Sequence, residues 1–318
     1  MTRTVRHMLS LAEAGPDNVA RLVARALAIS RDERANLGTL SDKTVGVYFR
    51  RSSTRTRTAF AVGAMRLGAN VIQYGPNDLQ IVTGETIEDT ARVLSNYLDI
   101  LVIRTNETPA EMRSLAAQNQ MAVINAMSAS EHPTQALADL TTIKEAFGRL
   151  DGLHLLYLGE GNNTASALAF AVGMTEGMRL TLVTPAGYGL PDDVMAQAGE
   201  LARAAGAEVA QFHDLERLPT GVDVVYTTRW QTMGEPKADP NWREKFDPYA
   251  VTAALMARVS KPSGTIFMHD LPAVRGAEVS DEVLDGPQSV AFRQSKHKMT
   301  SAMAVLEWCA GIDPPGTA

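Results

Sequence analysis

The stretch 100–147, ILVIRTNETPAEMRSLAAQNQMAVINAMSASEHPTQALADLTTIKEAF, decides the fold class. Short apolar runs at 100–104 and 122–125 predict buried strands, and apolar residues at helical spacing predict helices over 109–119 and 133–147. Strands and helices that alternate at this spacing form βαβ units, whose strands are parallel and whose crossovers are right-handed. The stretch therefore predicts an α/β fold built on a parallel sheet.

The same alternation continues on both sides of this stretch. It predicts further strands at 43–49, 70–74, 154–158, 180–184, 208–211, 222–226 and 264–268, and further helices at 17–37, 53–67, 86–97, 191–205 and 299–308. At roughly 150 residues per domain, a chain of 318 residues favours two domains. Because the pattern restarts after Gly148, we expect two doubly wound parallel-sheet domains, 1–148 and 149–318, with helix 299–308 packing back on the first.

Charge and composition exclude several classes of function. The 36 acidic residues outnumber the 30 basic ones, so we expect no nucleic-acid partner, because non-specific binding of that kind depends on phosphate neutralisation. No apolar run reaches the ~18 residues of a membrane span, and the N-terminus lacks the apolar region of a signal peptide. The single cysteine, Cys309, fits the reducing cytoplasm and excludes a CxxC-type zinc site, so we expect no metal.

The motif STRTR at 53–57 follows the strand expected at 43–49 and opens a helix. Ligands of doubly wound sheets bind beyond the carboxyl ends of the strands, and a helix N-terminus favours an anion. The two arginines of the motif offer planar forks to phosphate oxygens, and its three hydroxyls add donors. With Arg50 and Arg51 beside it, the motif is either an oxyanion site or a solvated basic turn with a serine cap. Its position at a strand end favours the oxyanion site.

The motif HPTQ at 132–135 opens another helix in the same way. Proline suits the first helical position, which puts His132 at the N-cap, where the helix dipole disfavours added positive charge. A neutral imidazole and the Gln135 amide can both donate to a carbonyl, although a capping histidine is the simpler interpretation. Arg104 ends the strand at 100–104 and can point into the same crevice. Each of these signals is weak when taken alone.

Together, the STRTR motif, Arg104 and the HPTQ motif resemble the carbamoyl-phosphate half-site of the aspartate/ornithine carbamoyltransferase family, and GET at 84–86 with DTARVL at 89–94 is similar to that family as well. The resemblance covers nearly the whole chain. It implies transfer of a carbamoyl group from carbamoyl phosphate to the amine of a small amino acid, with no cofactor. Gln80 matches a glutamine that ornithine-type members extend from a neighbouring subunit, which implies a homotrimer with shared active sites.

The resemblance also implies which residues carry the reaction. Carbamoyl phosphate would be bound by Ser53, Thr54, Arg55, Thr56, Gln80, Arg104, His132, Gln135, Leu271 and Lys298. The catalytic residues would be Arg55, Thr56, Arg104, His132, Gln135 and Asp270. Within this set, donors stabilise the charge that builds on the carbamoyl oxygen, Arg55 and Arg57 hold the leaving phosphate, and Asp270 either orients the attacking amine or accepts its proton.

The second half of the chain is similar to ornithine rather than aspartate carbamoyltransferase. The loop GEGNN resembles one whose last asparagine, Asn163 here, contacts the α-carboxylate of the acceptor. Three positions depart from the ornithine pattern. In HDLP, Asp270 stands in place of a cysteine, and Lys298 stands in place of an arginine that binds carbamoyl phosphate. In TRWQTMG at 228–234, Thr228 stands in place of the aspartate that pairs with the α-ammonium of ornithine.

The acceptor is therefore open at the level of sequence. The acceptor-binding residues would be Asn163, Thr228, Arg229, Gln231, Thr232, Met233 and Asp270. TRxQ at 228–231 is similar to the aspartate enzyme, so this acceptor loop is a hybrid. An ammonium that loses its buried partner is destabilised by about 2–5 kcal/mol. We therefore hypothesise that the acceptor is altered, for example to a shorter diamino acid.

Alternatives to this hypothesis remain. The chain can be a genuine ornithine or aspartate carbamoyltransferase, in which case Asp270 pairs with Arg229 or with surface groups. It can also be a non-catalytic carbamoyl-phosphate-binding protein, although retention of the whole phosphate half-site argues against that. A dinucleotide dehydrogenase is disfavoured because the sequence has no GxGxxG motif.

Overall fold

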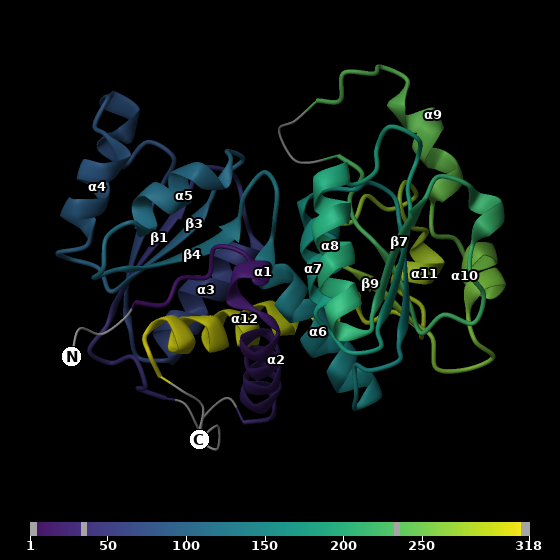
Figure 1. Cartoon of the computed structure of the whole chain (residues 1–318), viewed down its shortest axis with the longest axis horizontal. Coiled ribbons are helices and arrows are strands. Elements are labelled where there is room, and N and C mark those ends of the chain that lie inside the picture. Colours follow the sequence, from purple (N-terminus) through teal and green to yellow (C-terminus); the bar gives the residue numbers. More distant parts are fainter. Residues whose placement is uncertain (1–4, 33–36, 232–235, 313–318) are drawn as a thin grey trace. The chain divides into compact units, whose positions relative to one another are not determined.

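The computed structural model describes residues 5–32, 37–231 and 236–312 (Figure 1). These residues form two compact units, of which the second runs from Thr142 to Ser295 and the first contains the residues before and after it. This division falls inside the helix α6 (Pro133–Phe147), just before the domain boundary expected at 148–149. Each unit is built on one parallel sheet, so the predicted fold class is confirmed.

The first unit is built on a four-stranded sheet of order β2-β1-β3-β4. Its strands, all parallel, are β1 (Thr44–Phe49), β2 (Asn70–Tyr74), β3 (Ile100–Arg104) and β4 (Ala122–Met127). The three strands β1, β3 and β4 are apolar and buried, as strands covered on both faces must be. A Cβ at position 46 in β1 would lie 2.6 Å from Cδ1 of Leu98, so a larger residue there would force that side chain to shift.

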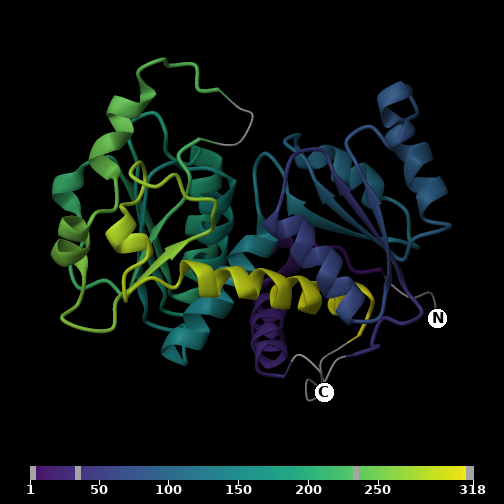
Figure 2. The ribbon, with the colours of Figure 1, turned by 180° about the vertical axis from the view of Figure 1, so that it is seen from behind.

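Helices cover both faces of this sheet, and the views of Figures 1 and 2 agree on which lies where. Side chains of α4 and α5 pack with those of β1, β3 and β4 in one core, and α3 and α12 lie on the opposite face. The helices of this unit are α1 (Leu11–Ala14), α2 (Pro16–Arg31), α3 (Arg55–Arg66), the 3-10 helix η1 (Gln80–Thr83), α4 (Ile87–Leu94), α5 (Pro109–Ala116), most of α6, and most of α12 (Ala291–Cys309).

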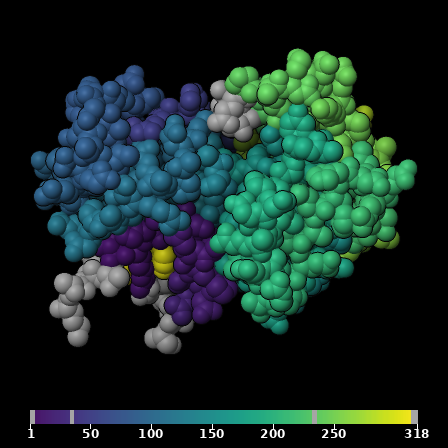
Figure 3. Space-filling view, turned by 45° about the horizontal axis from the view of Figure 1, so that its top comes forward, coloured from purple at the N-terminus to yellow at the C-terminus, as the bar shows by residue number. Residues whose placement is uncertain are grey.

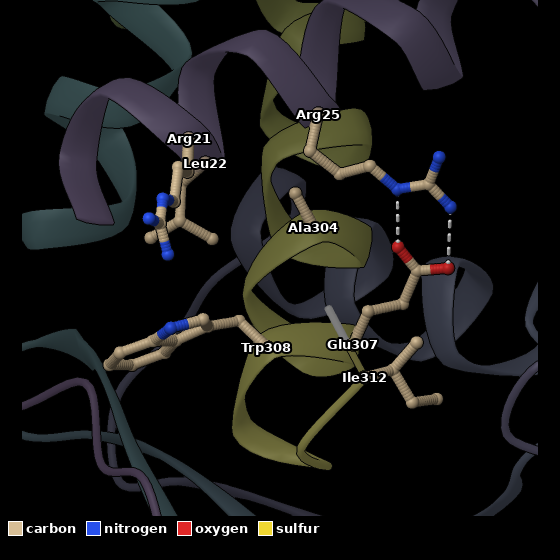
Figure 4. A pocket seen from close by; sticks show the side chains of 7 residues that line it. All are labelled: Arg21, Leu22, Arg25, Ala304, Glu307, Trp308 and Ile312. Carbon is tan, nitrogen blue, oxygen red and sulfur yellow. Dashed lines mark hydrogen bonds and ion pairs between the residues drawn. The ribbon is translucent and has the colours of Figure 1, made fainter. Parts of the chain in front are cut away.

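The C-terminal helix α12 packs on the first unit, as predicted from the sequence, but it begins at Ala291 rather than at 299. Arg25 on α2 donates to both carboxylate oxygens of Glu307 on α12, at 2.7 and 2.9 Å (Figure 4). Met303 of α12 contacts Gly63 of α3, where a Cβ would lie 3.0 Å from its Cγ. Figure 3 shows atoms of this helix in yellow at the surface between purple atoms of the N-terminal segment.

The second unit is built on a five-stranded parallel sheet of order β7-β6-β5-β8-β9. Figure 1 shows α7 and α8 on one face of this sheet and α10 and α11 on the other. The strands are β5 (His154–Leu158), β6 (Arg179–Val183), β7 (Glu208–Phe212), β8 (Val224–Thr227) and β9 (Ile266–His269). The helices are α7 (Asn163–Gly173), α8 (Asp192–Ala205), η2 (Leu215–Arg217), α9 (Trp242–Phe246), η3 (Asp247–Tyr249), α10 (Ala253–Val259) and α11 (Asp281–Leu284).

Several helices are shorter than their apolar periodicity predicts. The helix expected over 86–97 ends at Leu94, and the one expected over 109–119 ends at Ala116. After Leu94 the side chains of Ser95 and Asn96 both donate to the carbonyl of Arg92, at 3.0 and 2.8 Å. Such side-chain bonds compete with the helical ladder and end it, an effect that periodicity does not detect.

Candidate active site

The STRTR motif lies beyond the carboxyl end of β1, where it ends the connection to α3 and forms the first turn of that helix. The Ser53 hydroxyl accepts from the backbone N–H of Arg57 at 3.4 Å and from Nη1 of Arg104, at the end of β3, at 3.5 Å. Thr56 is buried on the first turn of α3, and Arg55 is half-buried. Because β1 and β3 are neighbours, the fold brings the hydroxyl motif and the strand-end arginine together.

Two arginines, one beside the motif and one within it, make other contacts. Arg50 pairs with both carboxylate oxygens of Glu111, at 2.9 and 2.7 Å, and also donates to the Tyr48 hydroxyl at 2.9 Å. Arg57 stacks with its guanidinium carbon 5.5 Å from the centroid of the Phe49 ring. Arg50 is therefore part of an ion pair with a largely buried carboxylate.

His132 directly precedes α6 and is only 4% exposed. Its Nδ1 is buried and has no hydrogen-bond partner among the residues that the structure describes. Burial first, and then the cationic groups of Lys298 and Arg104, lower the pKa of His132 well below its ordinary 6.5. The ring is therefore neutral at physiological pH, as the sequence predicts, and it retains an unused polar atom.

Gln135, one turn further along the HPTQ helix, is fixed by two buried neighbours. The Lys298 ammonium donates to Oε1 of Gln135, and Nε2 of Gln135 donates to Oδ1 of Asp139 at 2.7 Å. Asp139 is fully buried. The two partners fix the orientation of the amide, because a flipped amide would face the ammonium with its NH₂ group. Asp139 was not expected from sequence, although its spacing of i+4 from Gln135 puts both on one helix face.

The first unit thus gathers five of the predicted residues, namely Ser53, Arg104, His132, Gln135 and Lys298. The set combines two cationic groups, a hydroxyl, an amide and a neutral imidazole, all at or after the carboxyl ends of adjacent strands except Lys298, which lies on α12. Such a set can hold an anion and polarise a carbonyl oxygen. Gln80 does not join it: it lies exposed on η1, where Oε1 accepts from the Thr83 hydroxyl at 2.7 Å.

The GEGNN loop of the second unit follows β5 and is tightly packed. A Cβ at Gly161 would lie 2.3 Å from the backbone nitrogen of Leu190, so only glycine fits there. Asn162 caps α7, since its Oδ1 accepts from the backbone N–H groups of Thr164 and Ala165 at 3.0 and 3.2 Å. Asn163 is consequently the first residue of the helix.

Asp270 directly follows β9 and lies against residues from two other strand ends. Thr228, after β8, donates to its Oδ1 at 2.7 Å, and Thr164, after β5, donates to its Oδ2 at 3.1 Å. The three strands are neighbours in the order β5-β8-β9, which explains why positions so distant in sequence meet. Among the described residues Asp270 forms no ion pair with Arg229, so the pairing considered from sequence is wrong.

The adjoining His269 is a structural residue. It is fully buried, and its Nδ1 accepts from the backbone N–H of Leu271 at 2.8 Å. The proton therefore lies on Nε2, which is 3.3 Å from a carboxylate oxygen of Glu278. This arrangement fixes the start of the HDLP turn and hence the position of Asp270. The Leu271 side chain packs against the core of the second unit.

The remaining acceptor-loop residues are only partly described. Arg229 and Gln231 line a cavity of about 20 Å³ together with Trp230, Trp242 and Glu278. Thr232 and Met233, also predicted to bind the acceptor, lie outside the described residues.

Within the described ranges, no group of three or more His, Cys, Asp or Glu side chains could hold a metal ion. No helix in the same ranges has the length and apolarity that crossing a membrane requires.

Comparison with known proteins identifies the class. Residues 6–145 match the carbamoyl-phosphate-binding domain of aspartate/ornithine carbamoyltransferase, and residues 151–309 match the Asp/Orn-binding domain. The chain therefore belongs to the aspartate/ornithine carbamoyltransferase family and is a carbamoyltransferase, which confirms the resemblance seen in the sequence.

Individual relatives lie on the ornithine side of the family. Ornithine carbamoyltransferase of Caldicellulosiruptor saccharolyticus is 38% identical over 311 residues, covering 96% of this chain and 99% of that protein. The one from Halalkalibacterium halodurans is 38% identical over 303 residues, or 95% and 94% of the two chains. The structure of ornithine carbamoyltransferase from Pyrococcus furiosus superposes with a TM-score of 0.89 at 33% identity, covering 96% of this chain and 97% of that one.

Proposed function

We propose that this carbamoyltransferase uses ornithine as its acceptor and forms citrulline and phosphate from ornithine and carbamoyl phosphate. The relatives that are 38% identical over nearly the full chain carry the name ornithine carbamoyltransferase. The observation that carries the proposal is the 2.7 Å hydrogen bond between Thr228 and the carboxylate of Asp270. It removes the reason for which the sequence favoured a different acceptor.

That reason was the loss of a carboxylate at 228. An α-ammonium placed beside Thr228 still meets a carboxylate, because Asp270 extends to that side chain from the neighbouring strand end. The carboxylate expected at position 228, after β8, is instead at position 270, after β9. The two positions are joined by a hydrogen bond. The ammonium then keeps a partner and avoids the roughly 2–5 kcal/mol that a lost buried partner costs. We therefore favour ornithine over a shorter diamino acid, and the kinetic experiment below compares the two.

The reaction needs no covalent intermediate. The neutral δ-amine of ornithine attacks the carbamoyl carbon, a C–N bond forms, and the C–O bond to phosphate breaks. Negative charge builds on the carbonyl oxygen, where Thr56, Arg104 and His132 stabilise it. The amine loses one proton, and the leaving phosphate can accept it. His132 suits the donor role because its lowered pKa keeps the ring neutral and it has a polar atom to spare.

The remaining residues are assigned to the phosphate, to the carbamoyl group or to ornithine. We assign Ser53, Thr54, Arg55 and Thr56 to the phosphate, and Gln135, Leu271 and Lys298 to the carbamoyl group. Asn163 would hold the α-carboxylate of ornithine, with Arg229 and Gln231 alongside. Asp270 would orient the α-ammonium, so that the δ-amine is the nucleophile.

We also propose a homotrimer in which Gln80 enters the site of the adjacent subunit. Gln80 lies in a part of the first unit that exposes large apolar side chains, whose exposed fractions are 42% for Ile72, 54% for Val82, 47% for Val93 and 70% for Tyr97. Exposed large apolar side chains of this kind are candidates for a subunit interface. A second copy of the chain covering it would bring Gln80 to a neighbour.

The acceptor is tested by steady-state kinetics with a panel of amino acids at saturating carbamoyl phosphate, with release of phosphate and formation of the ureido product both measured. We expect ornithine to have the highest kcat/KM, above 2,4-diaminobutyrate, 2,3-diaminopropionate and aspartate. A higher value for 2,3-diaminopropionate or aspartate would overturn ornithine as the acceptor. Absence of turnover with every amine would favour a non-catalytic carbamoyl-phosphate-binding protein.

A further inference from the structure

Lys237 occupies an unusual environment in the second unit. Its ammonium lies 5.0 Å from the ring centroid of Tyr188, 5.3 Å from that of Trp242 and 5.0 Å from that of Phe246. The rings also contact one another, with Phe246 at 4.8 Å from Tyr188 and 5.4 Å from Trp242 between centroids. The side chain of Lys237 is only 9% exposed. Three aromatic faces around one desolvated cation form a cage that is stronger than the usual surface contact.

The same ammonium forms an ion pair with the carboxylate of Glu160. Glu160 belongs to the GEGNN loop, and its carbonyl accepts from the Tyr157 hydroxyl at 2.7 Å. Lys237 follows the acceptor loop, residues 228–234, in the chain. The ion pair therefore joins the segment after the acceptor loop to the loop that sets Asn163.

The beginning of the acceptor loop contacts the same cluster. Trp230 is 2% exposed, and its ring centroid is 5.3 Å from that of Phe246. A Cβ at Gly159 would lie 2.9 Å from Nε1 of Trp230, so the tryptophan packs directly on the GEGNN loop. The aromatic cluster thus contacts the chain on both sides of the undescribed residues.

A second connection joins the same two loops through the acceptor carboxylate. Thr228 and Thr164 both donate to Asp270, at 2.7 and 3.1 Å. The GEGNN loop and the helix turn directly after it are therefore tied to the segment around the acceptor loop at two points, one at Asp270 and one at Lys237. Removing either point leaves the spacing between Asn163 and Thr228 less defined.

We propose that Lys237 is a positioning residue for acceptor binding, which fixes the GEGNN loop relative to residues 228–231 through Glu160 and through the aromatic cage that packs on Trp230. The inference rests on the proposed role of these loops in holding the amino acid. Lys237 itself is not expected to touch the substrate. A compact ammonium on an apolar stem suits the cage, because the stem packs on the rings while the charge reaches Glu160.

The test is the substitution Lys237→Met, which keeps the stem and removes the charge. We expect KM for the acceptor to rise about tenfold or more, since the partly buried Glu160 carboxylate loses its cationic partner and the cage loses its cation. The Kd for carbamoyl phosphate, measured by calorimetry, should stay unchanged. Lys237→Arg, which keeps the charge, should have an acceptor KM close to that of the wild type. Glu160→Gln should raise KM in the same way as Lys237→Met.

A matched control is present in the same cluster. Lys245 lies 6.0 Å from the Tyr188 ring but is exposed and pairs with Asp239 at 2.7 Å. Lys245→Met should leave both kinetic constants within a factor of about two, because exposed pairs contribute little. General destabilisation of the fold would lower the active fraction and so kcat, without moving KM.

The outcomes separate the inference from the function on which it rests. The acceptor used is whichever amino acid the wild-type enzyme turns over best, so failure of ornithine overturns only the proposed acceptor. An unchanged acceptor KM in Lys237→Met overturns the positioning role. An equal effect from Lys245→Met, or a parallel loss of carbamoyl-phosphate binding, overturns it as well.

Discussion

In the proposed acceptor site, the carboxylate of Asp270 takes the place of the aspartate that is expected at position 228. Thr228 lacks a charge, but its hydroxyl is bonded to Oδ1 of Asp270 at 2.7 Å. A hydroxyl cannot neutralise an ammonium, whereas the carboxylate beside it can. Thr164 satisfies the second oxygen of Asp270, which holds the group in one orientation.

The substitution Asp270→Asn should therefore weaken acceptor binding far more than carbamoyl-phosphate binding. Loss of a partner for a buried ammonium corresponds to about 2–5 kcal/mol, or on the order of 30- to 4,000-fold in kcat/KM for ornithine. The double variant Thr228→Asp/Asp270→Cys returns the charge to its expected position and should recover much of the activity. A double variant no better than Asp270→Asn would contradict a shared charge site.

The ionisation of His132 gives a second prediction for a single residue. Its pKa is lowered well below 6.5, chiefly by burial and then by Lys298 and Arg104, so the ring stays neutral from pH 6 to 8. Nuclear magnetic resonance of ¹⁵N-labelled imidazoles should show no titration of His132 in that range. The variant His132→Ala should lose about 10²–10³ in kcat, as expected for one positioned donor. A resonance titrating near pH 6.5 would contradict the assignment of a neutral donor.

The segment that precedes His132 anchors the N-terminal helix α1. Glu131 is 5% exposed, and its Oε1 accepts from the backbone N–H of Leu11 at 2.8 Å. Ser10 also bonds to this carboxyl, and the charges of Glu13 and Arg113 lie nearby. Burial raises the pKa of Glu131 to about 7 in spite of these bonds. The connection between β4 and α6 therefore depends on a carboxyl group that is protonated more easily than usual.

The sign of the resulting pH dependence follows from the raised pKa. Between the ordinary value of 4.5 and about 7, the folded chain keeps a proton on Glu131 that the unfolded chain has released. The free energy of unfolding should therefore fall as pH rises through this window, by about 3 kcal/mol from this group. Glu131→Gln removes the contribution. Urea unfolding at pH 5 and pH 8 measures it, and an identical pH dependence in both proteins would refute it.

The long elements could be predicted from the sequence because their signals are local. Strands such as β3 (Ile100–Arg104) and helices such as α6 (Pro133–Phe147) have uninterrupted apolar patterns, and both have the expected bounds. The short helix α9 (Trp242–Phe246) was not expected, since five residues are too few for periodicity to register. The helix α12 begins at Ala291, eight residues before the predicted start at 299, in a stretch whose first turns are largely polar.

The candidate site was predictable only where residue type and strand end coincide. The motif residues of the first unit lie after β1, β3 and β4, as doubly wound topology requires. The bond between Thr228 and Asp270 was not predictable, because it depends on which strands are neighbours. The same holds for Lys237, whose ring partners come from two segments, Tyr188 before α8 and Trp242 and Phe246 on α9.

At the scale of the whole molecule, the proposed trimer makes every site depend on two chains. Arg55→Ala and Gln80→Ala should each be nearly inactive as pure proteins. When the two are unfolded, mixed in equal amounts and refolded together, roughly a quarter of the sites should combine an intact Arg55 with a neighbour's intact Gln80. Recovery of about that share of wild-type activity, with a trimer by sedimentation, would support shared sites. No recovery in mixed trimers would contradict them.

The claim on which the whole account depends is that the half-site of the first unit binds carbamoyl phosphate. Isothermal calorimetry of the wild-type protein and of Arg55→Ala tests it directly, with circular dichroism to check that the variant is folded. We predict saturable heat with one carbamoyl phosphate per chain for the wild type and none for the variant. A wild-type protein that gives no saturable heat, or a folded variant that binds equally well, would contradict it.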